Sequence, residues 1–439
     1  MRRMRGSWVL CGVACAVMSV GAGCGKSESQ AAAGSSGAFG IVTVDGKQKL
    51  YLPEPSQNAA GHGEIAVVDV GVEGDGVNGA NAQLSRIDLG TSDYATATGG
   101  DSTVVVAAST FFPTVWLIDP HTDAVTKTLT LPDSYGSSSF SGGGGYVTGI
   151  AVDSANHRAI LSVWNGFALL DTTSGTITQV IEAPPSENFG FDSVKQRIIA
   201  PFYGCESSTD ATYTPPPFCG DYKDTTGVEM TDGVNVIDLA TGTVYTYQDP
   251  DYANEDSGGT GNTPVDTEPD SAAVNPNTGV VVVASEGAGN KHVIDLGNGD
   301  FDSGSKAVTA SQHVVDDDYA GLTGVSIEPS SNLAFLEGEG SSSVGVLKLD
   351  DANDGNGKII VGQMPDLPDG NSWSNMGDPH GIAVTTGIND GQSVGFVVTY
   401  DGQWVARVDL EAFAGMTPDL TGIVAPAEMA SVVTYLKVQ

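Results

Sequence analysis

Short runs of apolar residues, separated by turn-forming residues, follow one another along the chain from residue 39 onward. Residues 147–182 show the pattern clearly, with VTGIAVD, HRAILSVW, GFALLD and TITQVIE in succession and Asp, Asn, Gly and Ser between them. Runs of this length, rich in apolar and β-branched residues, are typical of β-strands, and helical spacing is absent from the stretch. The pattern predicts four successive antiparallel strands within one structural unit.

One phrase within this pattern recurs seven times. Its copies are VNVIDLATG at 234–242, FALLDTTSG at 167–175, VWLIDPHTD at 115–123, IAVVDV at 65–70, KHVIDL at 291–296, VGVLKL at 344–349 and VARVDL at 405–410. The Asp of the phrase, or Lys348 in its place, stands at positions 69, 119, 171, 238, 295, 348 and 409, so neighbouring copies are 50 to 67 residues apart. A fixed phrase at wide intervals indicates one supersecondary unit that is stacked many times.

Four short strands with their turns fit each interval, and four antiparallel strands repeated around an axis form a β-propeller blade. A solenoid is the alternative, but solenoids usually have shorter repeats and distinct caps, and no cap is visible in the sequence. We therefore predict an all-β fold, a β-propeller of seven four-stranded blades. The weak strand character of YATAT at 94–98 leaves six or eight blades open.

The same pattern locates the inner strand of each blade. These strands are expected to begin near Phe39, Tyr94, Val147, Asn188, Asp270, Gly321 and His380. The last blade takes its fourth strand from residues 431–438, so the ring is expected to close end against end, without a blade shared between the termini. Residues 411–430 interrupt the pattern and are expected to hold a short helix or an irregular insertion.

The recurring Asp has a structural explanation. It ends the third strand of each blade, and a T-x-x-G or similar run makes the tight turn into the fourth strand. Asp and Thr side chains hydrogen-bond the backbone of such turns, and Gly or Asn accepts a positive φ. We interpret these Asp residues as turn builders rather than as ligands.

Three of the repeats, VNVIDLATGTV, VWLIDPHTDAV and DPHGIAV (Asp378–Val384), resemble those of YVTN-type, lactonase-like β-propellers. The resemblance covers about residues 39–410 and implies the propeller fold. The family includes binding and surface proteins as well as lactone hydrolases, so the resemblance does not select an activity. The chain departs from the family in its longer repeats, and only the last blade carries the full PHGIAV phrase.

The N-terminal residues predict export. Met1–Arg5 contains three arginines, an apolar run follows at Trp8–Val20, and Gly21, Ala22 and Gly23 precede Cys24. This order is typical of a secretory signal, and the apolar run is short for a membrane span. A Cys directly after small residues resembles a bacterial lipobox, with Cys24 as the lipidated residue. Plain secretion with cleavage nearby is the alternative.

These features predict three segments: a lipoprotein signal peptide at 1–23, a flexible tether at 24–38 and the propeller domain at 39–439. The tether is small and polar, which is typical of a flexible linker. Gly25 stands where an Asp favours inner-membrane retention in some bacteria. We therefore expect an exported protein of the bacterial cell envelope, held in the membrane through lipid at Cys24, at the outer membrane or cell surface.

Cysteine usage agrees with export. Cys11 and Cys15 leave with the signal peptide, and Cys24 carries lipid, so Cys205 and Cys219 remain as an even pair. They bracket a polar, proline-rich segment, and we predict a disulfide between them. Closing a loop of about fifteen residues stabilises the fold by about 3 kcal/mol in the chain-entropy model.

The charge balance is strongly acidic. The chain contains 54 Asp and Glu against 18 Lys and Arg, a formal net charge of −36. Such a chain is repelled by nucleic acid, so we expect no nucleic-acid partner. The acids either keep an exported domain soluble or bind Ca²⁺, which prefers oxygen ligands. The loops Asp295–Asp302 and Asp350–Gly357 hint at Ca²⁺, although neither matches a full EF-type loop.

The sequence contains no H-E-x-x-H motif, no phosphate loop and no Rossmann glycine pattern in a strand–helix context. Propeller geometry still favours one end of the ring as the place of a binding site. At that end the loops that enter the inner strands meet the loops between the second and third strands. Candidate binding residues there are Glu187, Asn188, Glu268, Asp270, Glu286, Glu337, Trp164, Asn165, Tyr400 and Asp401, with Phe111, Phe112 and Glu339 nearby. Acids, Asn and aromatics that converge on a channel mouth are typical of a binding site. Acids beside prolines are also ordinary turn formers, so a solvated rim is the alternative.

Two functional hypotheses follow. The preferred one is a lipid-anchored propeller, expected to be a monomer, that binds a partner protein, a glycan or a small ligand at the channel mouth without chemistry. The alternative is a Ca²⁺-dependent hydrolase of the lactonase type at the same face. In that case Asp378 would belong to the carboxylate cluster and His380 would act as general base.

Overall fold

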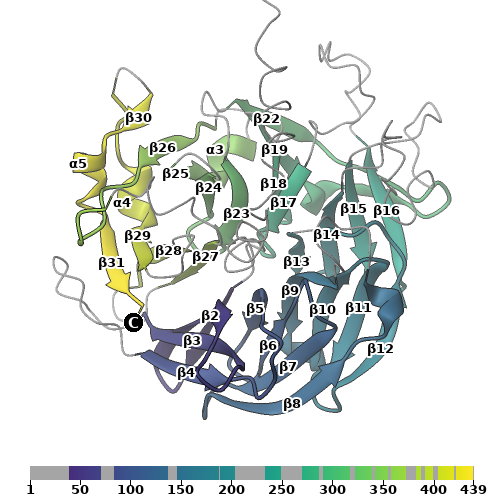
Figure 1. Ribbon diagram of the computed structural model, residues 1–439. Helices are drawn as coiled ribbons and strands as arrows, with labels where there is room; N and C mark the ends of the chain where they lie inside the picture. Colours follow the sequence, from purple (N-terminus) through teal and green to yellow (C-terminus); the bar gives the residue numbers. More distant parts are fainter. Residues whose placement is uncertain are drawn as a thin grey trace, which may run out of the picture.

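The computed structural model describes residues 39–70, 84–136, 146–186, 188–202, 233–248, 269–285, 290–316, 322–338, 342–353, 357–371, 382–386, 391–398, 404–419 and 422–438. They form seven antiparallel sheets arranged in a ring (Figure 1). Each sheet has four strands that follow the chain from the inner edge outward, and two sheets carry additional outer strands. The predicted seven-bladed, all-β propeller is therefore confirmed, and the blades are numbered 1 to 7 along the chain.

The strands take corresponding positions in every blade. The inner strands are β1 (Gly40–Val44), β5 (Ala97–Gly100), β9 (Val147–Asp153), β13 (Gly190–Asp192), β17 (Pro269–Val274), β23 (Leu322–Glu328) and β27 (Ile382–Thr386). The second strands are β2 (Lys47–Gln57), β6 (Val105–Ala108), β10 (Arg158–Val163), β14 (Arg197–Phe202), β18 (Val280–Ser285), β24 (Leu333–Gly338) and β28 (Ser393–Val398). The third strands are β3 (Gly63–Asp69), β7 (Thr114–Asp119), β11 (Gly166–Asp171), β15 (Gly233–Asp238), β19 (Asn290–Asp295), β25 (Ser343–Lys348) and β29 (Trp404–Asp409). The fourth strands are β4 (Leu84–Asp88), β8 (Ala124–Thr130), β12 (Thr176–Ile181), β16 (Thr243–Gln248), β22 (Gln312–Asp316), β26 (Ile360–Gln363) and β31 (Val433–Lys437).

Apolar side chains fill each of the seven interfaces between neighbouring blades. Ile65 and Trp116, for example, are buried together between blades 1 and 2, and Phe335 and Val397 between blades 6 and 7. Both faces of a blade are thus covered, and in β7, β11 and β15 every residue before the terminal Asp is buried. A strand buried on both faces needs a continuous apolar run, which is what the recurring phrase supplies.

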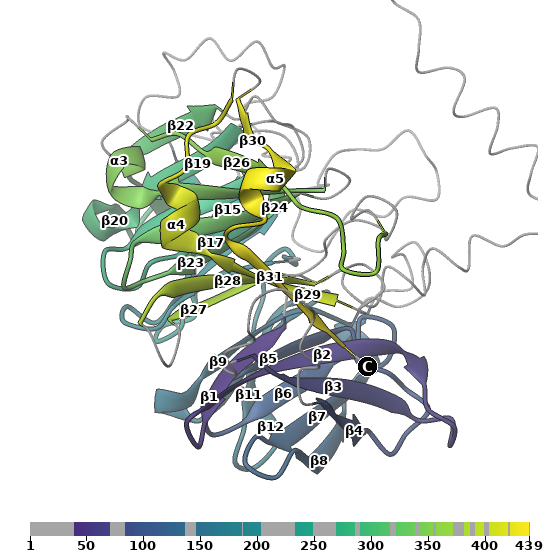
Figure 2. The same cartoon turned by 90° about the vertical axis from the view of Figure 1, so that its left-hand side faces the viewer.

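Blades 1 and 7 close the ring. Leu50 and Val68 of blade 1 pack with Phe396 and Leu436 of blade 7. The outer strand of blade 7 is β31, which pairs antiparallel with β29, and its end lies beside blade 1 (Figure 1, Figure 2). Every strand of blade 1 comes from the N-terminal side and every strand of blade 7 from the C-terminal side. The predicted closure of end against end is therefore confirmed.

Two connections between a third and a fourth strand extend the preceding blade. In blade 5 the connection forms β20 (Asp300–Asp302) and β21 (Ala307–Thr309), and β21 pairs in parallel with β16 of blade 4. In blade 7 it forms β30 (Ile423–Val424), which pairs in parallel with β26 of blade 6. Each insertion thus covers the edge of a neighbouring sheet, which leaves fewer unpaired backbone groups at the rim.

The α-helices that the structure describes are short and lie in connections between third and fourth strands. They are α3 (Leu349–Asn353), α4 (Leu410–Ala414) and α5 (Pro426–Met429), with 3₁₀ turns η1 (Asp133–Tyr135), η2 (Ser154–Asn156) and η4 (Leu296–Asn298). The expected insertion at 411–430 therefore consists of the greater part of α4, then β30 and α5. Within the described ranges, no helix has both the length and the apolar character needed to cross a membrane.

The recurring Asp builds turns, as predicted. Asp171 accepts hydrogen bonds from the N–H groups of Thr173 and Ser174, and Asp238 accepts them from Ala240 and Thr241. Asp119, Asp295 and Asp409 make equivalent bonds to His121, Asn298 and Ala412. Hydrogen bonds from Ser174 hold the pKa of Asp171 below its usual value, because they stabilise the ionised carboxylate.

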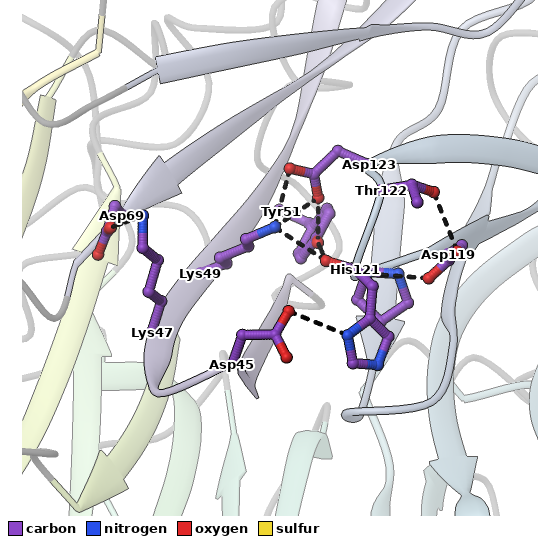
Figure 3. Close-up of polar contacts among 10 residues, drawn as sticks. Asp45, Lys47, Lys49, Tyr51, Asp69, Asp119, His121, Thr122 and Asp123 are labelled. Atoms are coloured by element: carbon purple, nitrogen blue, oxygen red, sulfur yellow. Dashed lines mark hydrogen bonds and ion pairs between the residues drawn. The ribbon is translucent and has the colours of Figure 1, made fainter.

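Asp123 departs from this scheme and joins blades 1 and 2 (Figure 3). It occupies the turn position that Gly175 and Gly242 hold in blades 3 and 4, and it has the same left-handed backbone, with φ of 51°. Its carboxylate accepts hydrogen bonds from the Tyr51 hydroxyl at 2.6 Å and from the Lys49 ammonium at 2.9 Å. Burial, followed by the bond to Asp123, raises the pKa of Tyr51. We call these three residues the Asp123 clamp.

Replacement of Asp123 by Gly tests the clamp. Glycine keeps the positive φ of the turn but removes the carboxylate, so the Lys49 ammonium and the buried Tyr51 hydroxyl are left with the Pro120 carbonyl, at 2.8 Å and 3.4 Å. We expect the free energy of unfolding in urea to fall by about 1–3 kcal/mol. Asp45→Gly is the matched control, since Asp45 also has a φ of 51° but its side chain is 70% exposed and pairs with His121. That variant should stay within about 0.5 kcal/mol of the wild type. Equal losses in the two variants would contradict a stabilising clamp.

Candidate functional site

The inner strands of all seven blades enclose a central channel with a cavity of about 330 Å³. Its wall is formed by residues 39–41, 98–100, 149–152, 188–191, 271–274, 324–327 and 382–384. Among these described lining residues there is no Asp, Glu, His, Lys, Arg or Cys. The wall consists of glycine, apolar side chains, Thr98, Asn188, Ser271 and Ser326, together with the strand backbones. Such a wall can bind a ligand through shape and hydrogen bonds, but it offers no general acid, general base or thiol.

Glycines recur in this wall because neighbouring inner strands approach each other closely. A Cβ atom on Gly99 of blade 2 would lie 2.8 Å from Ile150 Cγ2 of blade 3. A Cβ atom on Gly40 of blade 1 would lie 3.1 Å from the backbone nitrogen of Gly100. The glycines are therefore needed for packing at the axis, where the strands leave little room for side chains.

Hydroxyl groups also join inner strands across blade boundaries. Thr98 Oγ1 accepts a hydrogen bond from the Gly40 N–H at 2.9 Å and donates one to the Tyr51 carbonyl at 2.6 Å. Ser271 Oγ of blade 5 accepts one from the Val325 N–H of blade 6 at 3.3 Å. The hydroxyls of Thr98 and Ser271 thus hold the wall together.

The structure places four of the predicted binding residues in different surroundings. Asn188 lines the channel cavity and forms a parallel bridge with Ser271. Glu337 is 5% exposed and packs over Gly324, since a Cβ there would lie 2.5 Å from Glu337 Cγ. Trp164 and Asn165 lie half-buried in the β10–β11 connection, away from the cavity wall. Of these four residues, only Asn188 contributes to the described cavity.

The other predicted site residues lie outside the described residues. They are Glu187, Glu268, Glu286, Glu339, Tyr400, Asp401, Asp378, His380, Cys24, Cys205 and Cys219, while Asp270 is described for its backbone in β17 only. The predicted disulfide, the lipidation site and the alternative catalytic pair therefore remain predictions.

In the acidic loops considered for Ca²⁺, the carboxylates of Asp295, Asp302 and Asp350 accept hydrogen bonds from other groups of the protein. Asp295 accepts hydrogen bonds from the Asn298 N–H at 3.2 Å and from its side-chain amide at 2.7 Å. Asp302 accepts them from the Gly304 N–H and the Ser305 hydroxyl. Asp350 accepts one from the Asn332 side chain at 2.5 Å. Across the described ranges, no three His, Cys, Asp or Glu side chains gather closely enough to hold a metal ion.

A group of aromatic residues lies on blades 2 and 3, at the end of the ring where Trp164 is found. We call it the aromatic ledge, and it consists of Tyr94, Phe111, Phe112, Tyr135, Tyr146 and Trp164. All six side chains are half-buried. They come from connections that enter an inner strand or join a second to a third strand, and these connections meet at one end of a propeller.

The ledge is held together by specific contacts. The ring centroids of Tyr94 and Phe112 are 5.1 Å apart, with the rings edge to face, and Phe111 lies 6.0 Å from Tyr94. The Tyr146 N–H donates to the Thr110 carbonyl at 2.9 Å, and the Trp164 N–H donates to the Tyr135 carbonyl at 3.2 Å. Sequence reasoning placed Phe111, Phe112 and Trp164 at this end but missed the three tyrosines. Tyr94 and Tyr146 lie just before inner strands, and Tyr135 lies in a 3₁₀ turn between two blades. These positions in the sequence could have indicated that the three tyrosines lie at this end of the ring.

Comparison with known proteins supports the fold alone. No family model matches the chain, and no curated protein matches it. Its structure is similar to that of a complex of KlAtg21 with the coiled coil of AgAtg16, at 8% identity over 92% of this chain and 99% of that chain, with a TM-score of 0.51. Hydrazine synthase of Kuenenia stuttgartiensis is 11% identical over 92% of this chain and 97% of its own, with a TM-score of 0.48. The Cps50 (Swd1) β-propeller domain of Myceliophteria thermophila is 10% identical over 72% of this chain and 83% of its own, with a TM-score of 0.46.

The close approach at the channel wall predicts a cost for Gly99→Ala. The added methyl group would clash with Ile150 and force the inner strands of blades 2 and 3 apart. We expect the free energy of unfolding to fall by about 1–3 kcal/mol, as measured in urea. Gly415→Ala is the matched control, because Gly415 has a φ of −92° and its added Cβ would meet the nearest atom at 3.4 Å. A Gly99→Ala protein as stable as the Gly415→Ala protein would contradict this account of the wall.

Proposed function

We propose that this protein is an exported, lipid-anchored β-propeller of YVTN type in the bacterial cell envelope. It binds a partner protein, a glycan or a small ligand at the mouth of its channel and performs no chemistry on it. The fold itself is that of a binding scaffold: a rigid ring that presents irregular connections at its ends. Signal-like residues 1–23, Cys24 and the polar segment that follows support export and anchoring.

The observation that carries the binding proposal is the neutrality of the channel wall. The described lining residues include no titratable side chain, although the chain as a whole contains 54 Asp and Glu. A cavity of about 330 Å³ falls in the range of small-ligand pockets. A neutral wall of that size favours binding over acid–base catalysis, which requires a positioned proton donor or acceptor.

Assays for hydrolysis test the absence of chemistry. The full-length protein, incubated with γ-butyrolactone or p-nitrophenyl acetate in the presence of Ca²⁺, should hydrolyse them no faster than the buffer does. Asp378→Ala and His380→Ala should behave in the same way. Turnover by the wild type that either substitution removes would overturn the proposal and favour the lactonase-type alternative.

The anchor is tested separately in bacterial cells. Cys24→Ser should abolish incorporation of labelled palmitate and move the protein from the membrane fraction to the soluble exported fraction, because the thiol that accepts lipid is lost. Cys205→Ser is the matched control, and it should keep both the label and the membrane fraction. Membrane association that survives Cys24→Ser would rule out a lipid anchor at this position.

A further inference from the structure

The aromatic ledge differs from a half-buried ring pair on blade 4. On blade 4 the rings of Tyr245 and Phe301 meet at 5.2 Å and 90°, and the guanidinium of Arg197 lies 4.2 Å from the centre of the Phe301 ring. A cation of the protein itself thus covers that pair. No Lys or Arg of the described residues lies over the rings of Tyr94, Phe111 or Phe112.

The charges around the ledge are acidic. Asp93 precedes Tyr94, Asp133 begins the turn that contains Tyr135, and Glu182 directly follows β12 at the same end of blade 3. Asp133 and Glu182 are exposed. These carboxylates and the net charge of −36 create a negative potential beside half-exposed aromatic rings.

Basic residues near the ledge are committed elsewhere. Residues 84–136 and 146–186 contain three Lys and Arg residues. Lys127 extends to the Ser174 carbonyl in a turn at the opposite end of the ring, and Arg158 pairs with Asp153 at 2.9 Å. Arg86 is at the ledge's end of its blade but forms an ion pair with Glu54. Within the described part of these two ranges, no Lys or Arg is therefore placed over the rings of Tyr94, Phe111 and Phe112.

We propose that the aromatic ledge is the docking surface for a partner protein that presents a basic, arginine-containing segment. Negative potential draws such a segment to this end of the ring, and aromatic faces bind guanidinium groups while their edges supply apolar contact. Tyr and Trp are also the residue types that most often dominate binding energy at protein interfaces. The inference deepens the proposed binding role by naming the class of partner, and it rests on that role.

The test uses the full-length protein and two short synthetic peptides, one of alternating Arg and Gly and one of alternating Glu and Gly. Titration is followed by calorimetry at about 0.15 M salt, where unspecific attraction is screened beyond about 8 Å. We expect the Arg–Gly peptide to bind and the Glu–Gly peptide not to bind. In the double variant Tyr94→Leu with Phe112→Leu, the affinity should fall about tenfold or more, because the apolar bulk remains but the ring faces are lost.

The matched control is Tyr245→Leu with Phe301→Leu, which removes the ring pair that Arg197 already covers. Its affinity for the Arg–Gly peptide should stay within about twofold of the wild-type affinity. That change is well below the tenfold loss expected for the ledge variant, which corresponds to about 1.4 kcal/mol. If the ledge double variant does not show the wild-type circular dichroism spectrum, the single variant Phe111→Leu carries the same expectation, since Phe111 is half-buried and its ring lies 6.0 Å from that of Tyr94.

Three results would overturn the proposal. The first is no binding of the Arg–Gly peptide to the wild type. The second is equal affinity in the ledge and control variants, which would indicate attraction by net charge alone. The third is binding of a neutral oligosaccharide, cellohexaose, that the ledge substitutions abolish while peptide binding persists. The hydrolysis and palmitate assays do not involve the ledge, so they test the absence of chemistry and the lipid anchor separately from the docking proposal.

Discussion

The propeller depends on the burial of both faces of every blade. A four-stranded sheet with two apolar faces is stable only when another sheet covers each face. A closed ring gives every sheet two such neighbours. The seven buried clusters each join two adjacent blades, and the one that contains Leu50 and Phe396 closes the circle between the first blade and the last. Removal of any interface would therefore expose two sheet faces, so the ring is stabilised as a whole.

Closure also decides what the channel can contain. Seven inner strands that converge on one axis leave so little space that Gly40 and Gly99 cannot carry side chains, and the hydroxyl of Thr98 is taken up by contacts between blades. The wall is therefore built mainly from backbone and neutral side chains. No charged side chain lines the described wall, so a ligand that needs a charged contact would have to find it in the connections at the ends, where packing imposes fewer limits.

The sequence predicted much of this fold, because the recurring phrase encodes both properties that shape a blade. Its apolar run marks a strand buried on both faces, and its Asp marks the turn, as the bonds of Asp171 and Asp238 confirm. The sequence did not predict the parallel pairing of β21 with β16, since it joins a connection of blade 5 to the fourth strand of blade 4 through three residue pairs. The Asp123 clamp was hidden for a similar reason: in the sequence Asp123 merely replaces a turn glycine, and its partners lie more than 70 residues away.

The candidate site illustrates the same limit. Tyr94, Tyr135 and Trp164 are far apart in the chain, and nothing in the local pattern shows that they share one surface; only the ring geometry brings their connections to one end. The repeats make the seven blades similar, yet the ledge occupies two of them, so a partner would approach off the axis rather than into the channel. A neutral channel and an acidic, aromatic rim are thus two consequences of one architecture. The axis is constrained by close packing, and the rim is where the blades are free to differ.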